Sequence, residues 1–296
     1  MSYIQNQLKN IQFLLFLSLI ISLFCCENDK GKENEPDLPD KENTDTNTVA
    51  ELIDTICPDG ILYDSDCYND SVLAIWGMGD EELYYSGNDR EYEWYIDQAN
   101  TGAASENNCG PCCAAMATSW YDKNLAVTAE EARNMIPNDG GWWYTNNIID
   151  FLNHYSVPNT IYAFSDCQQL IDFISDGNII ILCLTTALIR YNDESDERID
   201  RFYGYADGHF LIVKGVRDVD TDTYFEVYDP NNWNALYDDN TEKGKNRHYR
   251  ATDISNAISE WWKYLIVIYP DAGKSKSTES IYKKIVPSEI AHAWGR

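Results

Sequence analysis

Residues 107–112 read NNCGPC, and small and apolar residues follow them from Ala114 to Tyr121 (AAMATSWY). Proline is well placed in the first turn of a helix, where its missing amide hydrogen costs nothing, so Pro111 predicts the start of a buried helix. The unpaired amides and the dipole of such a start favour a thiolate, which lowers the pKa of a cysteine there. This segment therefore predicts that Cys109 is a nucleophile.

A thiolate nucleophile needs a base, and the sequence offers four histidines: His154, His209, His248 and His292. Only His209 begins a run typical of a β-strand (HFLIVKGV), and Asp229 directly follows the next such run (TYFEVY). Adjacent antiparallel strands can bring the two side chains together, so that the carboxylate orients the imidazole. The sequence thus predicts His209 as the base and Asp229 as its orienting partner, with Asn231 or Asn232 as alternatives for that partner.

A tetrahedral intermediate also needs hydrogen-bond donors for its oxyanion. Gln98, in the segment DQAN, offers a side-chain amide upstream of the cysteine. Together with the backbone amide of Cys109, it is our candidate oxyanion donor.

Four features follow one another along the chain: Gln98, NCGP at 108–111, GHFLIV at 208–213 and VYDP at 227–230. This order resembles the papain-like cysteine peptidases of the bacteriocin-processing, double-glycine-leader type. The resemblance covers roughly residues 94–270 of the chain. The immunoglobulin-cleaving cysteine proteases of the streptococcal type have the same arrangement and are an alternative set of relatives.

The resemblance implies Cys109 as nucleophile, His209 as general base and then general acid, Asp229 as orienter and Gln98 as oxyanion donor, with no metal or cofactor. Papain's own motif would make Cys112 the nucleophile, but Gly-Pro directly after the first cysteine favours Cys109. Two features depart from the family pattern. The spacing from Gln98 to Cys109 is longer than in papain, and no transporter membrane domain follows, so we do not expect processing of leader peptides during export.

The remaining segments predict an α+β fold, with N-terminal helices packed on an antiparallel sheet that carries the histidine and the aspartate. Capping patterns predict helices that begin at Thr128, Thr145 and Asp166. Apolar runs predict further strands at 178–185 and 263–269, the first of them covered on both faces. The polar segment 191–201 is expected to form an exposed loop.

The N-terminal region predicts export. Residues 11–24 have the length of a signal-peptide core and are followed by Cys26 in a segment that resembles a lipobox, so Cys26 is the expected lipidation site. The predicted organisation is a lipoprotein signal peptide at 1–26, a disordered acidic tether at 27–50, an N-terminal extension at 51–90, the papain-like domain at 91–270 and a C-terminal tail at 271–296. The expected location is an outer membrane or a bacterial cell surface, with a disulfide between Cys57 and Cys67 as a first hypothesis.

The formal net charge of −27 argues against nucleic acid or an anionic membrane face as a partner. We expect a monomer that acts on a peptide or protein substrate. Two other functions remain open. The tetrapeptide Cys-Gly-Pro-Cys at 109–112 is also a thioredoxin-type redox motif, although no apolar strand precedes it, and the protein could be a surface binding module without turnover. The aromatic segment 142–144 could line a substrate cleft or pack in the core.

Overall fold

The computed structural model describes residues 70–137, 140–271 and 281–290. All of them lie in the second of the two units into which the chain divides, Thr46–Arg296. The predicted signal peptide, the expected lipidation site Cys26, the predicted acidic tether and the Cys57–Cys67 pair lie outside the described residues. Among those that are described, no helix is long and apolar enough to cross a membrane.

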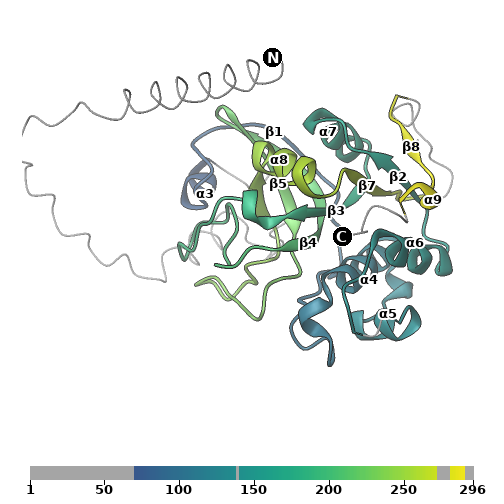
Figure 1. The fold of residues 1–296 in the computed structure, drawn as a ribbon. Helices are drawn as coiled ribbons and strands as arrows, with labels where there is room; N and C mark the ends of the chain where they lie inside the picture. The colour runs from purple at the N-terminus through teal and green to yellow at the C-terminus, as the bar shows by residue number, and fades with distance from the viewer. Residues whose placement is uncertain (1–69, 138–139, 272–280, 291–296) are drawn as a thin grey trace, which may run out of the picture. The chain divides into compact units, whose positions relative to one another are not determined.

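An antiparallel sheet forms the centre of this unit, with the strand order β6-β5-β4-β3-β7-β2-β8 and with β1 paired to β4 (Figure 1). Its strands are β1 (Glu82–Gly87), β2 (Asn159–Ala163), β3 (Ile179–Thr185), β4 (Gly208–Val219), β5 (Asp222–Tyr228), β6 (Arg247–Arg250), β7 (Tyr264–Ile268) and β8 (Lys284–Ile285). Strands β3 to β6 pair in their sequence order, whereas β7 pairs with β3 and β2, and β1 pairs with β4, so the sheet also joins distant segments of the chain.

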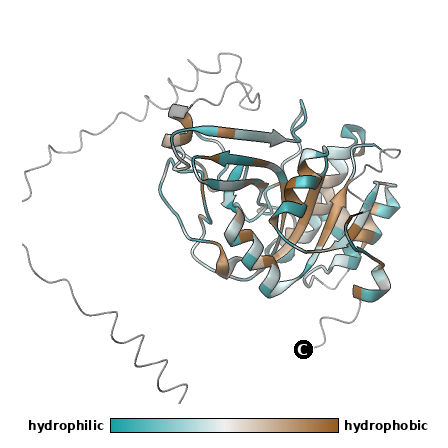
Figure 2. Cartoon of the chain, turned by 90° about the horizontal axis from the view of Figure 1, so that it is seen from above, coloured by the Kyte–Doolittle hydropathy of each residue, from teal (hydrophilic) through white to brown (hydrophobic). Residues whose placement is uncertain are grey.

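Helices cover the sheet on both faces. They are α3 (Asp70–Ile75), α4 (Cys109–Tyr121), α5 (Ala129–Met135), α6 (Thr145–His154), α7 (Cys167–Ser175), α8 (Ala251–Trp261) and α9 (Pro287–Ile290). Alternate residues of β3 enter two different cores: Ile179 and Ile181 pack with α4 and α6, whereas Ile180 and Leu182 pack with α7 and α8. Figure 2 shows these apolar central strands in brown. The predicted α+β class and the strand covered on both faces are confirmed.

All three helices expected from capping patterns are present, and the predicted cap is confirmed in two of them. Thr128 and Glu131 form a full capping box before α5, and Asp166 accepts a hydrogen bond from the amide of Gln169 at the start of α7. The predicted helix at Thr145 is present as α6, but its cap is Tyr144 and not Thr145. The Thr145 hydroxyl instead accepts a hydrogen bond from the indole nitrogen of Trp262, at 2.9 Å.

The prediction of an exposed loop at 191–201 holds only for its first part. Residues 198–201 are buried, and Ile199 forms an isolated bridge with His248 of β6. The buried guanidinium of Arg201 donates to the carbonyl oxygens of Tyr203 and Tyr205, so the chain after it is fixed against the body of the protein. Arg201 thus turns inward to backbone carbonyls, and buried Arg198 pairs with Asp239, which polarity alone does not indicate.

Both flanks of the predicted papain-like domain contribute to the sheet. Before residue 91, β1 pairs with the second half of β4. After residue 270, β8 pairs with β2, and the side chains of Ile285 and Ile290 are buried. These flanking residues therefore share the hydrogen bonding and core of the central domain.

His248 makes the stability of this fold sensitive to acid. Its ring is fully buried, neither ring nitrogen has a hydrogen-bond partner among the described residues, and the ring stacks on Trp76 with centroids 6.0 Å apart. Burial lowers its pKa from 6.5 to about 3; the charge of Glu226 opposes this shift, while Arg217, Lys214 and Arg198 add to it. The folded state therefore requires the neutral ring.

We expect His248→Phe to reduce the loss of stability in acid. Because the folded pKa lies below the unfolded value, the wild-type protein has the full contribution of the neutral ring above about pH 6.5 and loses it as the pH falls toward 3. Urea unfolding at pH 7, 5 and 4 measures this difference. The exposed His154→Phe serves as control, and an equal acid response of wild type and His248→Phe would contradict the prediction.

Candidate active site

Cys109 is the first residue of α4, and Pro111 lies in the first turn of that helix, as the sequence predicts. The residue before it is fixed by hydrogen bonds. The buried side chain of Asn108 donates to the carbonyl and the hydroxyl of Thr101, both at 2.9 Å, and accepts from the guanidinium of Arg133. These contacts hold the start of the helix, and with it the direction of the cysteine side chain.

The surroundings of Cys109 favour its thiolate. Burial raises the pKa of the thiol, but a hydrogen bond and the charge of His209, together with the backbone amides of Phe210 and Gly110, outweigh burial and lower it overall. The amide of Gly110 belongs to the helix start and that of Phe210 to β4. The thiol therefore lies where the helix meets the strand that carries the base.

His209 and Asp229 form the charged pair that the strand pattern predicts. The two strands β4 and β5 are paired in the sheet, and His209 Nε2 lies 2.7 Å from Asp229 Oδ1. Burial alone would lower the pKa of His209, but the charge and hydrogen bond of Asp229 and the contact with Cys109 raise it to about 10. Because Nε2 is bound to Asp229, Nδ1 is the ring nitrogen available to the thiol.

Asp229 is fully buried, and hydrogen bonds surround its carboxylate. Besides the histidine, Oδ1 accepts the amide of Asn231 at 2.9 Å, while Oδ2 accepts the hydroxyls of Tyr203 at 3.0 Å and Tyr249 at 2.6 Å. Burial raises the pKa of Asp229, but His209 and these donors bring it below its ordinary value. The carboxylate is thereby held charged and in one orientation.

Gln98 lines the same cleft as Cys109, and its side chain is buried. The backbone amide of Gln98 donates to the carbonyl of Pro230 at 2.8 Å, and its backbone carbonyl accepts the Thr101 hydroxyl at 2.6 Å. The side-chain oxygen Oε1 has no hydrogen-bond partner among the described residues. The position of Gln98 is therefore compatible with oxyanion binding, and that role stays a prediction.

Asp97 connects the Gln98 segment to the turn after Asp229. Its carboxylate accepts the amides of Trp233 at 3.0 Å and Asn234 at 2.7 Å, and the side-chain amide of Asn232 at 3.0 Å. Trp233 and Asn234 both adopt a left-handed backbone, which is unusual for tryptophan and needs such support. This contact couples the two loops that carry Gln98 and Asp229.

Three contributors to the site were missed in the sequence: Tyr203, Tyr249 and Asp97. Tyr203 lies in the segment after the predicted exposed loop, and Tyr249 lies in the short strand β6. Neither tyrosine belongs to a motif or periodic run, so no local signal marks it. The position of Asp97 next to Gln98 was the one available hint.

The alternative partners for the imidazole are engaged elsewhere. Asn231 Oδ1 accepts the Tyr205 hydroxyl at 2.5 Å and the Trp233 indole nitrogen at 2.7 Å. Asn232 donates to Asp97 and accepts the amide of Gly244. The structure thus places Asp229, and neither asparagine, against the ring of His209.

The redox reading of residues 109–112 finds little support in the geometry. Cys109 and Cys112 are both free thiols, and Cys112 is fully buried. Burial and the nearby Cys109 raise the pKa of the Cys112 thiol well above its ordinary value. A dithiol that exchanges with partners needs a reactive and accessible pair, which Cys112 does not offer. Within the described residues, no group of three or more His, Cys, Asp or Glu side chains is placed to hold a metal ion.

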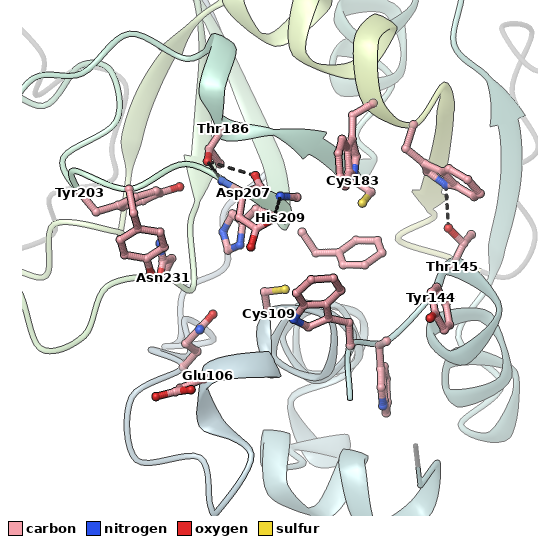
Figure 3. A pocket seen from close by; sticks show the side chains of 18 residues that line it. Glu106, Cys109, Tyr144, Thr145, Cys183, Thr186, Tyr203, Asp207, His209 and Asn231 are labelled. Carbon is pink, nitrogen blue, oxygen red and sulfur yellow. Dashed lines mark hydrogen bonds between the residues drawn. The ribbon is translucent and has the colours of Figure 1, made fainter. Parts of the chain in front are cut away.

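A cleft opens beside the catalytic candidates. Cys109, His209 and Gln98 line it together with aromatic residues (Figure 3). Of the aromatic segment 142–144, Trp142 and Tyr144 are exposed and line the cleft, while Trp143 lines it from a buried position. Both readings of this segment therefore apply, each to different residues.

Residues 93–256 match the profile of the Peptidase_C39 like family. The chain belongs to this family. The match spans the segment that carries Gln98, Cys109, His209 and Asp229, and it confirms the resemblance to papain-like cysteine peptidases. The papain-like fold class is confirmed with it.

Two solved structures show weaker likeness. One is assigned to a C39-like peptidase from Bacillus anthracis, with 12% identity, a TM-score of 0.43, and coverage of 64% of this chain and 98% of that chain. The other is UfSP from C. elegans, with 14% identity, a TM-score of 0.38, and coverage of 62% of this chain and 34% of that chain. The search of curated proteins found no significant match.

Proposed function

We propose that the protein hydrolyses peptide bonds through a thioester on Cys109. The observation that carries this proposal is the continuous contact from the Cys109 thiol through the His209 ring to the Asp229 carboxylate, with Nε2 and Oδ1 2.7 Å apart. Membership of a peptidase family supports the same reaction. The lowered pKa of Cys109 and the raised pKa of His209 favour an ion pair of thiolate and imidazolium near neutral pH.

In the first half of the reaction, the Cys109 thiolate attacks the carbonyl carbon of the scissile peptide bond. The oxyanion of the tetrahedral intermediate accepts hydrogen bonds from the backbone amide of Cys109 and the side-chain amide of Gln98. His209 then gives its proton to the leaving nitrogen as the carbon–nitrogen bond breaks. An amine leaves, and a thioester on Cys109 remains.

In the second half, neutral His209 takes a proton from a water molecule as that water attacks the thioester. The second tetrahedral intermediate collapses, the carbon–sulfur bond breaks, and the product acid leaves. Asp229 stabilises the imidazolium in both halves of the reaction. The cycle ends with the thiolate and the charged ring restored.

We also propose that the enzyme acts outside the cytoplasm as a lipoprotein anchored through Cys26. The support is the sequence pattern at residues 11–26 and the acidic segment that follows it. Labelling cells with a radioactive fatty acid, with Cys26→Ala as the comparison, tests the anchor independently of catalysis.

Alkylation by iodoacetamide tests the thiolate directly. Cys109 and Cys167 are both half-buried, but the pKa of Cys109 is lowered while burial raises that of Cys167. We therefore expect mass spectrometry to show Cys109 alkylated at mildly acidic pH, where Cys167 stays unmodified. His209→Ala removes the main stabiliser of the thiolate and should move alkylation of Cys109 to higher pH.

Equal alkylation rates of Cys109 and Cys167 across the pH range would contradict an activated thiolate. An unchanged profile in His209→Ala would show that the imidazole does not set the reactivity of the cysteine.

A further inference from the structure

The cleft has an aromatic end with exposed rings. Trp142 is 53% exposed, Tyr144 45% and Trp261 38%, and all three line the cleft. They come from the segment before α6 and from the last turn of α8. Rings that remain this exposed around one hollow are typical of a binding surface, because folding alone would bury them.

Trp261 brings this aromatic surface up to the catalytic candidates. A Cβ atom added to Gly208 would lie 2.4 Å from its ring, so the indole lies directly on the backbone of Gly208. The next residue of that strand is His209. A substrate side chain that contacts Trp261 would therefore lie within a residue or two of the bond under attack.

The other end of the cleft is polar and acidic. Figure 3 shows Glu106, Asn231 and Tyr203 on one side of Cys109 and His209, and Tyr144 and Thr145 on the other. Glu106 is exposed just before α4. Gln98, whose buried Oε1 has no hydrogen-bond partner among the described residues, also lines the cleft.

Apart from the catalytic pair, the fixed charges that line the cleft are negative. The carboxylate side chains of the lining are Glu106 and Asp207, and neither lysine nor arginine is among the lining residues. An acidic side chain of a substrate would meet like charge there without a compensating cation, whereas a basic side chain near Glu106 would meet an opposite charge.

We propose that the substrate is a peptide with a large apolar or aromatic side chain on one side of the scissile bond and a basic side chain on the other. The aromatic end, formed by Trp142, Tyr144 and Trp261, takes the apolar side chain, and Glu106 takes the basic one. This assignment rests on the proposed peptidase function and adds the class of peptide to it.

The test is cleavage of a randomised octapeptide library by the wild-type protein, with the cleaved bonds read by mass spectrometry. We expect enrichment of Phe, Trp, Tyr and Leu on one side of the cleaved bond, enrichment of Lys and Arg on the other, and depletion of Asp and Glu on both. Trp142→Ala and Tyr144→Ala should each lower kcat/KM for the enriched peptides about tenfold, the value for loss of one aromatic contact.

The two ends should respond separately. Trp142→Ala and Tyr144→Ala remove the aromatic enrichment and keep the basic one, while Glu106→Gln removes the basic enrichment and keeps the aromatic one. Tyr84→Ala is the control, since Tyr84 is an exposed aromatic residue of β1 outside the cleft. Cleavage that depends on Cys109 but shows no such enrichment, or enrichment that these variants leave unchanged, overturns the assignment of the cleft alone.

Protection from alkylation separates this assignment from the function. Peptides that pair Phe with Lys should protect Cys109 from iodoacetamide at lower concentrations than peptides that pair Phe with Glu. If no library peptide is cleaved but this difference in protection is present, the peptidase function fails and the cleft assignment stands. If no peptide is cleaved and the two peptides protect equally, both proposals fail.

Discussion

Cys109→Ala is expected to lower peptide hydrolysis by about four orders of magnitude or more. The other thiol that lines the cleft, Cys183, is buried, and burial raises its pKa, so it does not replace the Cys109 thiolate. The alanine removes the sulfur and leaves the start of α4 intact, since Asn108 and Arg133 hold that start through their own side chains. Steady-state hydrolysis of a peptide from the library measures the loss. Circular dichroism of the same sample checks that the variant is folded.

Cys112→Ala is the matched control for this experiment. Cys112 lies one turn further along the same helix, is fully buried, and has a raised pKa. We expect this variant to keep most of its activity, with a loss no larger than its effect on stability explains. A large loss in Cys112→Ala with activity kept in Cys109→Ala would move the nucleophile to Cys112, and equal loss in both would favour a dithiol mechanism.

Asp229→Asn is expected to lower kcat/KM by about two to four orders of magnitude at neutral pH. The negative charge of Asp229 is the main influence that raises the pKa of His209 to about 10 against the effect of burial. Without that charge, burial dominates, the ring loses its proton at a lower pH, and the thiolate loses its partner. The side-chain NH₂ of asparagine would also face donors that now bind the carboxylate.

The pH profile distinguishes this cause from simple misfolding. In the wild-type protein the imidazolium persists until the pH rises toward 10, so the variant should lose activity on the alkaline side at lower pH than the wild type. Asp172→Asn is the control. Asp172 lies on helix α7, outside the cleft, and like Asp229 it accepts a tyrosine hydroxyl, that of Tyr282 at 2.7 Å. If Asp229→Asn lowered activity equally at every pH and left the shape of the pH profile unchanged, the proposed role of Asp229 in raising the pKa of His209 would be contradicted.

The sequence identified residues whose local pattern is distinctive. Cys109 precedes a proline in a helix start, His209 begins an apolar strand, and Asp229 follows the next strand. Each of these positions follows from residue preferences at helix starts and strand ends, which can be read from a single sequence. The structure then brings the three side chains into one line, which the antiparallel pairing of β4 and β5 makes possible.

The residues that support Asp229 could not be found in the same way. Tyr203 and Tyr249 reach its carboxylate from segments without a motif, and their hydroxyls are recognisable as partners only once the fold brings them together. The inward turn of Arg198 and Arg201 has the same origin. Charged residues usually predict exposure to solvent. The buried position of Arg201 is explained by the backbone carbonyls that its guanidinium binds.

The short strands β6 and β8 could not be predicted from alternation of apolar and polar residues. β6 has the sequence RHYR, and β8 has two residues, so neither offers enough alternation to identify a strand. Helix α8 is a different case. Its buried residues Ile254, Ala257 and Ile258 have helical spacing, so the sequence itself carries a signal for this helix.

The pairing of β8 with β2 also affects how the protein can be shortened. A chain that ended at residue 270 would retain the whole candidate site, yet it would leave the backbone amides and carbonyls at the outer side of β2 without their partner. It would also uncover the apolar surface that Ile285 and Ile290 now fill. An uncovered strand beside an apolar patch invites pairing between molecules, so self-association would precede any loss of chemistry.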